Sequence, residues 1–267
     1  MPQYGKNLKI KTTLSSSMKD IFSIRDKVVV ITGAGRGIGN FLAMEMQKRS
    51  AIVYAIDKKF KNKSKTENLF MIKGDITNKK NISKICEQIF ITNRKIDVLI
   101  NNAGITLPKN TYDGYPHDRW DKTIKTNLTG AFVTTQSVIQ FMKKQGFGSV
   151  INITSINAEL GFPNNPAYVA SKGGLKMLTK SFAKDYGKYG IRVNNLGPGY
   201  IKTDMTKKSF QSKTIQLARE KQTLLGRWGE VSDLVGPCIF LASDASAYIT
   251  GQDIYVDGGW LANGLIE

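Results

Sequence analysis

The segment that most constrains the fold lies near the start of the chain, where an apolar run leads into a glycine-rich loop. Residues 27–33 read KVVVITG, a short apolar run that ends in glycine, as a buried parallel strand does. The loop TGAGRGIG at 32–39 then opens a segment, 36–50, with helical periodicity. A strand, a glycine-rich turn and a helix in this order predict the start of a dinucleotide-binding unit.

The glycines of this loop have separate expected tasks. Gly33 would allow a tight turn, Gly37 would let the backbone approach a phosphate, and Gly39 would allow close helix–strand packing. The free N–H groups and the positive dipole end of the helix would then face a pyrophosphate. The other loop positions assigned to the predicted cofactor site are Gly35, Arg36 and Ile38.

Strands and helices alternate along the rest of the chain. The further apolar, strand-like runs are 51–57, 69–77, 96–104, 149–155, 191–199 and 251–259. This alternation predicts an α/β fold, a single-domain Rossmann-type doubly wound parallel sheet of about seven strands flanked by helices. No linker-like stretch divides the chain after residue 26. We therefore expect a flexible N-terminal tail at 1–22 and one domain at 23–267.

Asp57 stands at the end of the second predicted strand. A carboxylate there can accept hydrogen bonds from the adenosine ribose and would repel a 2′-phosphate, which favours NAD(H) over NADP(H). Arg36, Lys58 and Lys59 could hold a phosphate, so NADP(H) is not excluded. The lysine-rich segment between Asp57 and Asp75 is short, and we expect its helix to be reduced or absent.

Polar or glycine-containing ends follow the other predicted strands. Ligands of such sheets lie outside the carboxyl ends of the strands, so these residues should converge on one crevice. They are Asp75, Ile76, Asn102, Ala103, Gly104, Ser155, Pro198 and Gly199. A further polar residue, Asn127, interrupts an apolar helical pattern, as either a helix-kinking or capping amide or a functional group.

Tyr168 and Lys172 stand four residues apart in a run, 168–187, with helical periodicity. Residues at this spacing share one helix face. A tyrosine alone holds its proton too tightly to act at neutral pH, but an adjacent ammonium favours the phenolate and lowers its pKa. The pair could therefore pass a proton to or from an alcohol or carbonyl oxygen.

The composition restricts the possible binding partners and the cellular location of the protein. The formal net charge of +18 comes mostly from dispersed lysine, without a nucleic-acid-binding motif, so we expect an anionic small molecule and no nucleic acid. No apolar run reaches the length of a membrane span, and the N-terminus carries no secretory signal, which predicts a cytoplasmic protein with no membrane partner. The single histidine, His117, and the spacing of Cys86 and Cys238 predict no metal site.

Together these motifs resemble the short-chain dehydrogenase/reductase family from about residue 22 to the end. They are TGAGRGIG, NNAG at 101–104, Asn127, Ser155, Tyr168-x-x-x-Lys172 and PGYIKT at 198–203. The resemblance implies that Tyr168 is the general acid/base and that Lys172 lowers its pKa and binds the nicotinamide ribose. It also implies that Ser155 holds the substrate oxygen and that Asn127 anchors a water molecule.

The same resemblance assigns the cofactor site. Asp75 and Ile76 would line the adenine pocket, and Asn102, Ala103 and Gly104 would pack along the adenosine ribose. Thr203 would bind the carboxamide. The remaining implied contacts come from Tyr168, Lys172, Pro198, Gly199 and Ile201.

The substrate is less constrained. Residues 225–264, with Trp228 and Trp260, resemble members of the family that act on sugar acids, gluconate 5-dehydrogenases among them. The alternative is a 3-oxoacyl-[acyl-carrier-protein] reductase, supported by PGYIKTDMT, although uncharged Val133 occupies the region where a docking arginine is expected. A non-catalytic dinucleotide-binding protein is the more distant alternative, which the four filled catalytic positions disfavour. We expect residues 200–226 to form a substrate lid that is mobile without ligand, and the resemblance implies a homotetramer.

Overall fold

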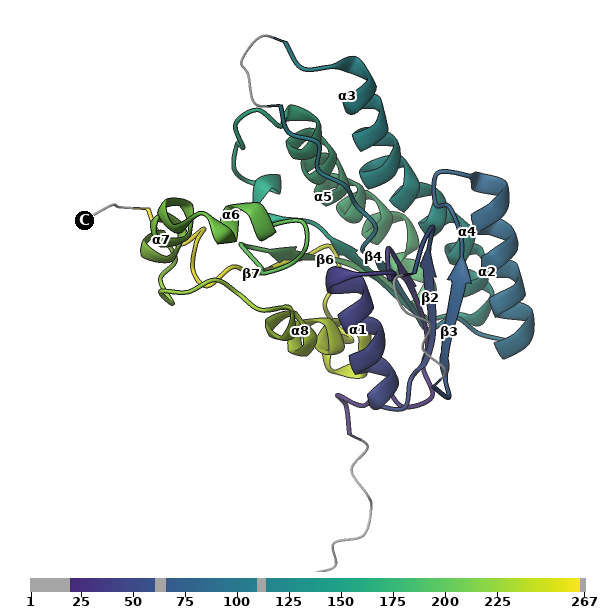
Figure 1. Ribbon diagram of the computed structural model, residues 1–267. Helices are drawn as coiled ribbons and strands as arrows, with labels where there is room; N and C mark the ends of the chain where they lie inside the picture. The colour runs from purple at the N-terminus through teal and green to yellow at the C-terminus, as the bar shows by residue number, and fades with distance from the viewer. Residues whose placement is uncertain (1–19, 61–65, 110–113, 265–267) are drawn as a thin grey trace, which may run out of the picture.

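The computed structural model describes residues 20–60, 66–109 and 114–264, which form seven parallel strands and the helices around them (Figure 1). The sheet order is β3-β2-β1-β4-β5-β6-β7. The strands are β1 (Val28–Thr32), β2 (Ile52–Asp57), β3 (Leu69–Lys73), β4 (Val98–Asn101), β5 (Gly148–Ile153), β6 (Ile191–Pro198) and β7 (Asp253–Val256). The helices are α1 (Gly37–Lys48), α2 (Lys79–Asn93), α3 (His117–Ile124), α4 (Gly130–Gln145), α5 (Pro166–Tyr186), α6 (Lys207–Gln211), α7 (Lys213–Gln222) and α8 (Val235–Ala242).

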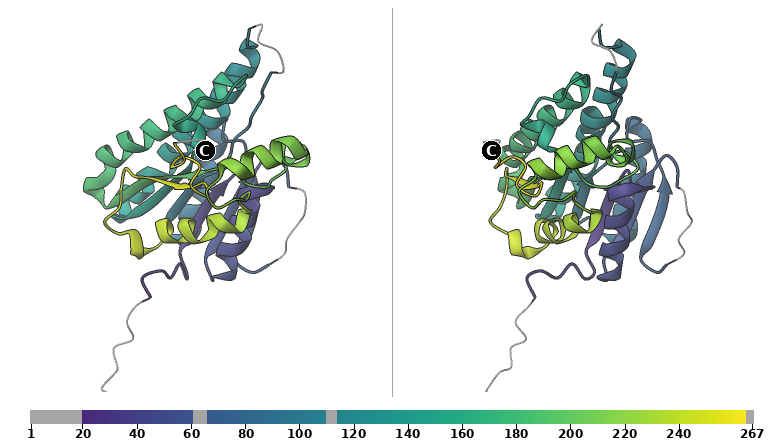
Figure 2. Two further views of the ribbon diagram at one scale, coloured as in Figure 1. Left: turned by 90° about the vertical axis from the view of Figure 1, so that its left-hand side faces the viewer. Right: turned by 60° about the vertical axis from the view of Figure 1, so that its left-hand side comes forward.

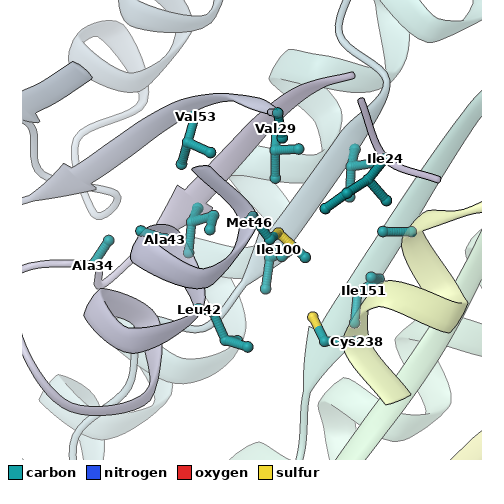
Figure 3. Packing of buried hydrophobic residues seen from close by; sticks show 14 of the residues in the cluster. Ile24, Val29, Ala34, Leu42, Ala43, Met46, Val53, Ile100, Ile151 and Cys238 are labelled. Atoms are coloured by element: carbon teal, nitrogen blue, oxygen red, sulfur yellow. The ribbon is translucent and has the colours of Figure 1, made fainter. Parts of the chain in front are cut away.

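Helices cover both faces of the sheet, which makes the sheet the centre of the core. On one face α1 and α8 bury Leu42, Met46 and Cys238 against the strands (Figure 3). On the other face α2, α4 and α5 bury a second apolar cluster that includes Ile82 and Val138 (Figure 1). Strands covered on both sides must be apolar throughout, and β1 is buried at all five positions. The seven strands expected from the sequence are confirmed.

The chain reverses its order of strands beside β1. From β1 the chain first builds outward through β2 to β3, and then returns to the other side of β1 to build β4 to β7. The connections that leave the carboxyl ends of β1 and β4 therefore run to opposite faces of the sheet. This leaves a crevice between them at this edge. Helices α6 and α7 lie beyond the ends of β6 and β7 at the same edge (Figures 1 and 2).

Two local expectations can be compared with the backbone. Residues 58–60 and 66–68 between β2 and β3 contain no helix, as expected, while 61–65 lie outside the described residues, as does most of the expected tail. The helical pattern after β4 is interrupted by a π-helix, Lys125–Thr129, which contains Asn127. Among the helices of the described chain, none is both long and apolar enough to cross a membrane.

A ladder of polar side chains crosses the buried sheet and fixes helix α5 to it. Asn101, Asn152, Asn195 and Asp253 are register partners on β4, β5, β6 and β7. Asn101 Nδ2 donates to Asn152 Oδ1 at 2.8 Å, and Asn195 Nδ2 donates to Asp253 Oδ1 at 2.7 Å. Between them Thr179 of α5 accepts from Asn152 at 2.7 Å and donates to Asn195 at 2.6 Å. Because buried polar groups need partners, this ladder sets the position of α5 over the strands.

Candidate active site

The structure brings the side chains of Ser155, Tyr168 and Lys172 together at the carboxyl edge of the sheet. Ser155 lies two residues after the end of β5, and Tyr168 and Lys172 lie on consecutive turns of α5. Ser155 lies close enough to Tyr168 to lower the pKa of its phenol as a hydrogen-bonding group. Lys172 Nζ donates to the carbonyl of Ile153 at 2.6 Å and lies 5.7 Å from the centroid of the Tyr168 ring. The predicted grouping of these three residues is therefore present.

Burial dominates the acid–base properties of this group. It raises the pKa of the Tyr168 phenol, and the hydrogen bond with Ser155 acts in the opposite direction. Burial also lowers the pKa of Lys172 to about 8. Lys172 is not among the groups that shift the pKa of Tyr168, and its ammonium donates to the backbone carbonyl of Ile153. That Lys172 lowers the tyrosine pKa stays a prediction.

Asn127 pairs with the loop that follows β4. Its Oδ1 accepts from the N–H of Ile105 at 2.8 Å, and its Nδ2 donates to the carbonyl of Ile105 at 2.9 Å. Nδ2 also donates to Ser171 Oγ at 3.1 Å, and Ser171 Oγ donates to the carbonyl of Tyr168 at 2.7 Å. Asn127 is buried and lies in a π-helix, a local departure from α-helical geometry. It also connects the loop to the helix that carries Tyr168.

Two residues of this site carried no clear sequence signal. Asn157 lies two positions after Ser155, and its N–H donates to Ser155 Oγ at 3.1 Å. Ser155 Oγ in turn lies 3.3 Å from Asn157 Oδ1, to which it donates. Ser171 lies beside Lys172 and contacts Asn127. A Ser-x-Asn spacing at a strand end indicates such a local turn, but only the fold shows that it orients the Ser155 hydroxyl.

The glycine-rich loop has the backbone that its sequence predicts. Gly33 and Gly37 have φ of +66° and +57°, in the left-handed region that favours glycine. A Cβ on Gly33 would lie 2.5 Å from Ala103 Cα, and one on Gly39 would lie 2.5 Å from the carbonyl of Gly33. A Cβ on Gly37 would meet nothing within 4 Å. The loop is thus closed toward the protein at Gly33 and Gly39 and open at Gly37, where a phosphate could approach.

Asp57 holds the glycine-rich loop in place. Its Oδ2 accepts from the N–H of Gly35 at 2.8 Å, and its Oδ1 accepts from the N–H of Lys59 at 3.1 Å. Arg36, at the N-cap of α1, is exposed. Ile38 packs partly against the core. A negative charge and an exposed positive charge therefore flank the place predicted for the adenosine ribose.

The predicted adenine end is formed by Asp75 and Ile76. Asp75 accepts hydrogen bonds from Thr77 and forms an ion pair with Lys58 at 3.0 Å. The hydrogen bonds from Thr77 and the contact with Lys58 lower the pKa of Asp75, although burial opposes them and is the largest single influence. Ile76 is buried. A Cβ on Gly130 would lie 2.5 Å from Ile76 Cδ1, so Ile76 is wedged against α4.

The segment after β4 is fastened to the end of β1. Asn102 Nδ2 donates to the carbonyls of Thr32 at 3.0 Å and Gly33 at 2.9 Å. The N–H groups of Asn102 and Ala103 both lie 3.2 Å from Thr32 Oγ1. A Cβ on Gly104 would lie 3.5 Å from Asn127 Oδ1 and 3.8 Å from Lys172 Nζ, so this segment passes close to both side chains.

The residues after β6 form the other wall of the crevice. Gly199 donates to the carbonyl of Val256 at 3.0 Å, and Ile201 forms a parallel bridge with Gly229. Thr203 is held by Thr206, whose Oγ1 accepts from its N–H at 3.0 Å. A cavity of about 480 Å³ separates this segment from the N-terminus of α1. It is lined by Gly37, Asn40, Phe41, Lys202, Thr203, Asp204, Lys207, Phe210 and Val231.

The known proteins whose sequences are similar to this chain all point to a single protein family. A sequence model of the family described as "Enoyl-(Acyl carrier protein) reductase" matches residues 33–261. The 5-keto-D-gluconate 5-reductase of Escherichia coli (strain K12) is 35% identical over 252 residues, covering 91% of this chain and 99% of that protein. The gluconate 5-dehydrogenase of Gluconobacter oxydans is 34% identical over 251 residues, covering 91% and 98%.

The fold is also similar to that of a solved relative. A gluconate 5-dehydrogenase from Burkholderia cenocepacia J2315, in complex with NADP and tartrate, superposes with a TM-score of 0.85. That protein is 32% identical, and the match covers 91% of this chain and 98% of the other. Sequence and fold similarity thus extend over about nine-tenths of this chain.

Proposed function

This chain belongs to the short-chain dehydrogenase/reductase family of NAD(P)-dependent oxidoreductases, and from this we propose that it interconverts a secondary alcohol and a ketone on a sugar acid. The convergence of Ser155, Tyr168 and Lys172 at the carboxyl edge of the sheet carries the proposal. The sugar-acid substrate is supported by relatives named for gluconate or 5-ketogluconate that are 34–35% identical over nearly their full length.

The proposed chemistry assigns one task to each side chain. In the reduction direction Tyr168 donates its phenolic proton to the oxygen of the substrate, and Ser155 donates a hydrogen bond to the same oxygen as charge develops there. The phenol of a tyrosine holds its proton at neutral pH, so Tyr168 has a proton to give in this direction. In the oxidation direction the charged Lys172 stabilises the phenolate that takes the proton from the alcohol. When bound along Gly33, Gly37 and Gly39, the dinucleotide supplies or accepts the hydride.

A substrate panel tests this proposal. Keto-sugar acids, neutral ketoses and 3-oxoacyl thioesters would each be offered with reduced dinucleotide, and the loss of absorbance at its reduced-nicotinamide band would be followed. We expect the highest kcat/KM with a keto-sugar acid. If only the thioesters were turned over, the protein would instead be a 3-oxoacyl reductase. The motif PGYIKTDMT supports that alternative.

For the cofactor we propose a preference for NAD(H), because Asp57 would face a 2′-phosphate with its negative charge. NADP(H) is the alternative, supported by the NADP in the Burkholderia structure and by exposed Arg36, Lys58 and Lys59. Asp57→Asn should weaken the binding of NAD(H) and strengthen the binding of NADP(H). The amide keeps an acceptor for the Gly35 N–H and removes the negative charge. Fluorescence titration of both cofactors measures this. An unchanged ratio of the two dissociation constants would remove Asp57 from cofactor selection.

We propose that residues 200–226 close over the crevice when ligands bind. The segment carries α6 and α7, neither of which buries a single residue fully. Elements with few buried contacts open readily. Amide hydrogen exchange in α6 and α7 should therefore be faster than in β5 without ligands and slow down with cofactor and sugar acid. Exchange as slow as in β5 without ligands would contradict a mobile lid.

We propose that the protein assembles as a homotetramer in the cytoplasm, with α4 and α5 at one interface and β7 at another. An apolar groove of about 370 Å³ lies between the helices and is lined by Leu128, Phe132, Met177 and Leu178, among others. Met177 is 59% exposed in the single chain. The two free cysteines, Cys86 and Cys238, suit a reducing compartment. Light scattering gives the mass of the assembly, and a monomer would refute the tetramer.

A further inference from the structure

An arginine of the lid lies in an aromatic cradle. Arg219 is on α7, and its Cζ lies 3.9 Å from the centroid of the Tyr200 ring and 5.3 Å from that of Trp228. Burial lowers the pKa of Arg219, and the adjacent Tyr200 side chain acts in the opposite direction. Phe210 and Trp260 complete the cradle, with ring centroids 5.3 Å from Trp228 and 4.6 Å from Tyr200. Rings on several sides hold the guanidinium in a defined place.

Arg219 differs from the cations around it. Arg227 forms two hydrogen bonds with Asp233, at 2.7 and 3.1 Å, and Lys202 forms an ion pair with Glu230 at 2.5 Å. Across the part of the chain that the structure describes, Arg219 forms no ion pair with a carboxylate. It is nevertheless half-buried, whereas the paired Arg227 is exposed.

The aromatic cradle lies at the carboxyl edge of the sheet, the same edge as Ser155. Tyr200 comes directly after Pro198 and Gly199, at the end of β6. Strand β6 is the neighbour of β5, which ends just before Ser155. Because adjacent strands are about 4.8 Å apart, Tyr200 begins within one small molecule's length of Ser155. Trp260 follows β7, the next strand outward.

Arg219 is partly removed from water and forms no ion pair with a carboxylate of the described residues. Removal from water disfavours its charge, and this burial lowers the pKa of Arg219. The rings of Tyr200 and Trp228 lie 3.9 and 5.3 Å from Arg219 Cζ, while a carboxylate is bound by the N–H groups of a guanidinium, which form a two-pronged donor. The two kinds of contact can therefore coexist. An incoming carboxylate would supply the charge that the cradle lacks.

We propose that Arg219, held by Tyr200 and Trp228, is the subsite that binds the carboxylate of the substrate. This inference rests on the proposed oxidoreductase function and names the residue that selects acids over neutral sugars. One end of the substrate would be fixed at Arg219 and the reacting carbon would lie at Ser155 and Tyr168. Because Arg219 belongs to α7, binding of the acid would also draw the lid toward the crevice.

Arg219→Met tests the subsite, since methionine keeps much of the packing and removes the charge. A charge-assisted bidentate contact predicts a rise in KM for a keto-sugar acid of about tenfold to a hundredfold, with little change in kcat. The KM for a neutral ketose should stay constant. The KM of Arg219→Lys for the keto-sugar acid should lie between those of wild type and Arg219→Met. Arg227→Met, which removes a cation that already has a carboxylate partner, is the matched control and should leave both KM values unchanged.

A binding measurement keeps the test independent of turnover. Trp228 lies beside Arg219, so D-gluconate bound there should change the tryptophan fluorescence of the dinucleotide-loaded protein. We expect the change in wild type and Arg227→Met and its loss in Arg219→Met. An unchanged KM, an equal rise in KM for acid and neutral substrates, or gluconate binding that survives in Arg219→Met would each overturn the subsite. A wild-type protein that binds gluconate but turns over only other carbonyl compounds would instead refute the proposed function and leave the subsite standing.

Discussion

Tyr168→Phe is expected to lower kcat by about 10²- to 10⁴-fold, the usual contribution of a positioned acid or base, while the dissociation constant of the dinucleotide stays within a few-fold of wild type. The phenylalanine ring keeps the packing of α5 and removes only the hydroxyl, whose pKa Ser155 influences. Steady-state rates with a keto-sugar acid and fluorescence titration of the cofactor measure the two quantities.

Tyr186→Phe provides the matched control for this variant. Tyr186 lies on the same helix and packs against Phe182, with the two ring centroids 5.7 Å apart. It also loses one hydroxyl but lies outside the crevice, so its kcat should equal that of wild type. Near-normal turnover by Tyr168→Phe would exclude Tyr168 as the proton donor. Equal losses in both variants would point to a general disturbance of α5.

Lys172→Met should also abolish most of the turnover, and it should change how stability depends on pH. Burial lowers the pKa of Lys172 to about 8 in the folded protein. The unfolded chain keeps a lysine pKa near 10.4. Between these values only the unfolded chain binds the proton. Raising the pH therefore favours the folded state of the wild type, an effect that the variant lacks.

Urea unfolding at several pH values measures this linkage. From about pH 8.5 to 10 the free energy of unfolding of wild type, relative to that of Lys172→Met, should rise by roughly 1.4 kcal/mol for each pH unit. Below about pH 7.5 the difference should be constant, because both states of the wild type then bind the proton. Lys180→Met, an exposed lysine on the same helix, should show no such slope. A flat difference for Lys172→Met would mean that Lys172 is not desolvated.

Much of the fold could be predicted because its signals are local. Most of the strands contain a short apolar run, and strict alternation with helices leaves a parallel sheet covered on both faces as the natural arrangement. The glycine-rich loop could be interpreted for the same reason. Positive φ at Gly33 and Gly37 and close packing at Gly39 are requirements that no other residue meets easily.

The long-range contacts of the site could not be predicted in this way. The polar ladder of Asn101, Asn152, Asn195 and Asp253 depends on strand register, which the chain sets only when the sheet forms. The pKa of Tyr168 depends on burial, which the spacing from Lys172 does not contain. Arg219 is one of many basic residues in the sequence, and only the fold places it on Tyr200 without a carboxylate partner among the described residues.

The fate of the hydride tests the proposed oxidoreductase reaction most directly. The wild-type protein would be supplied with a 5-keto sugar acid and a reduced dinucleotide in which both hydrogens at nicotinamide C4 are deuterium, and the product would be analysed by NMR and mass spectrometry. We predict one deuterium on the carbon that bears the new hydroxyl, with one oxidised dinucleotide formed for each alcohol, and no such product from Tyr168→Phe on the same timescale. Oxidation of the dinucleotide without a labelled alcohol, or labelled product formed equally fast by Tyr168→Phe, would contradict it.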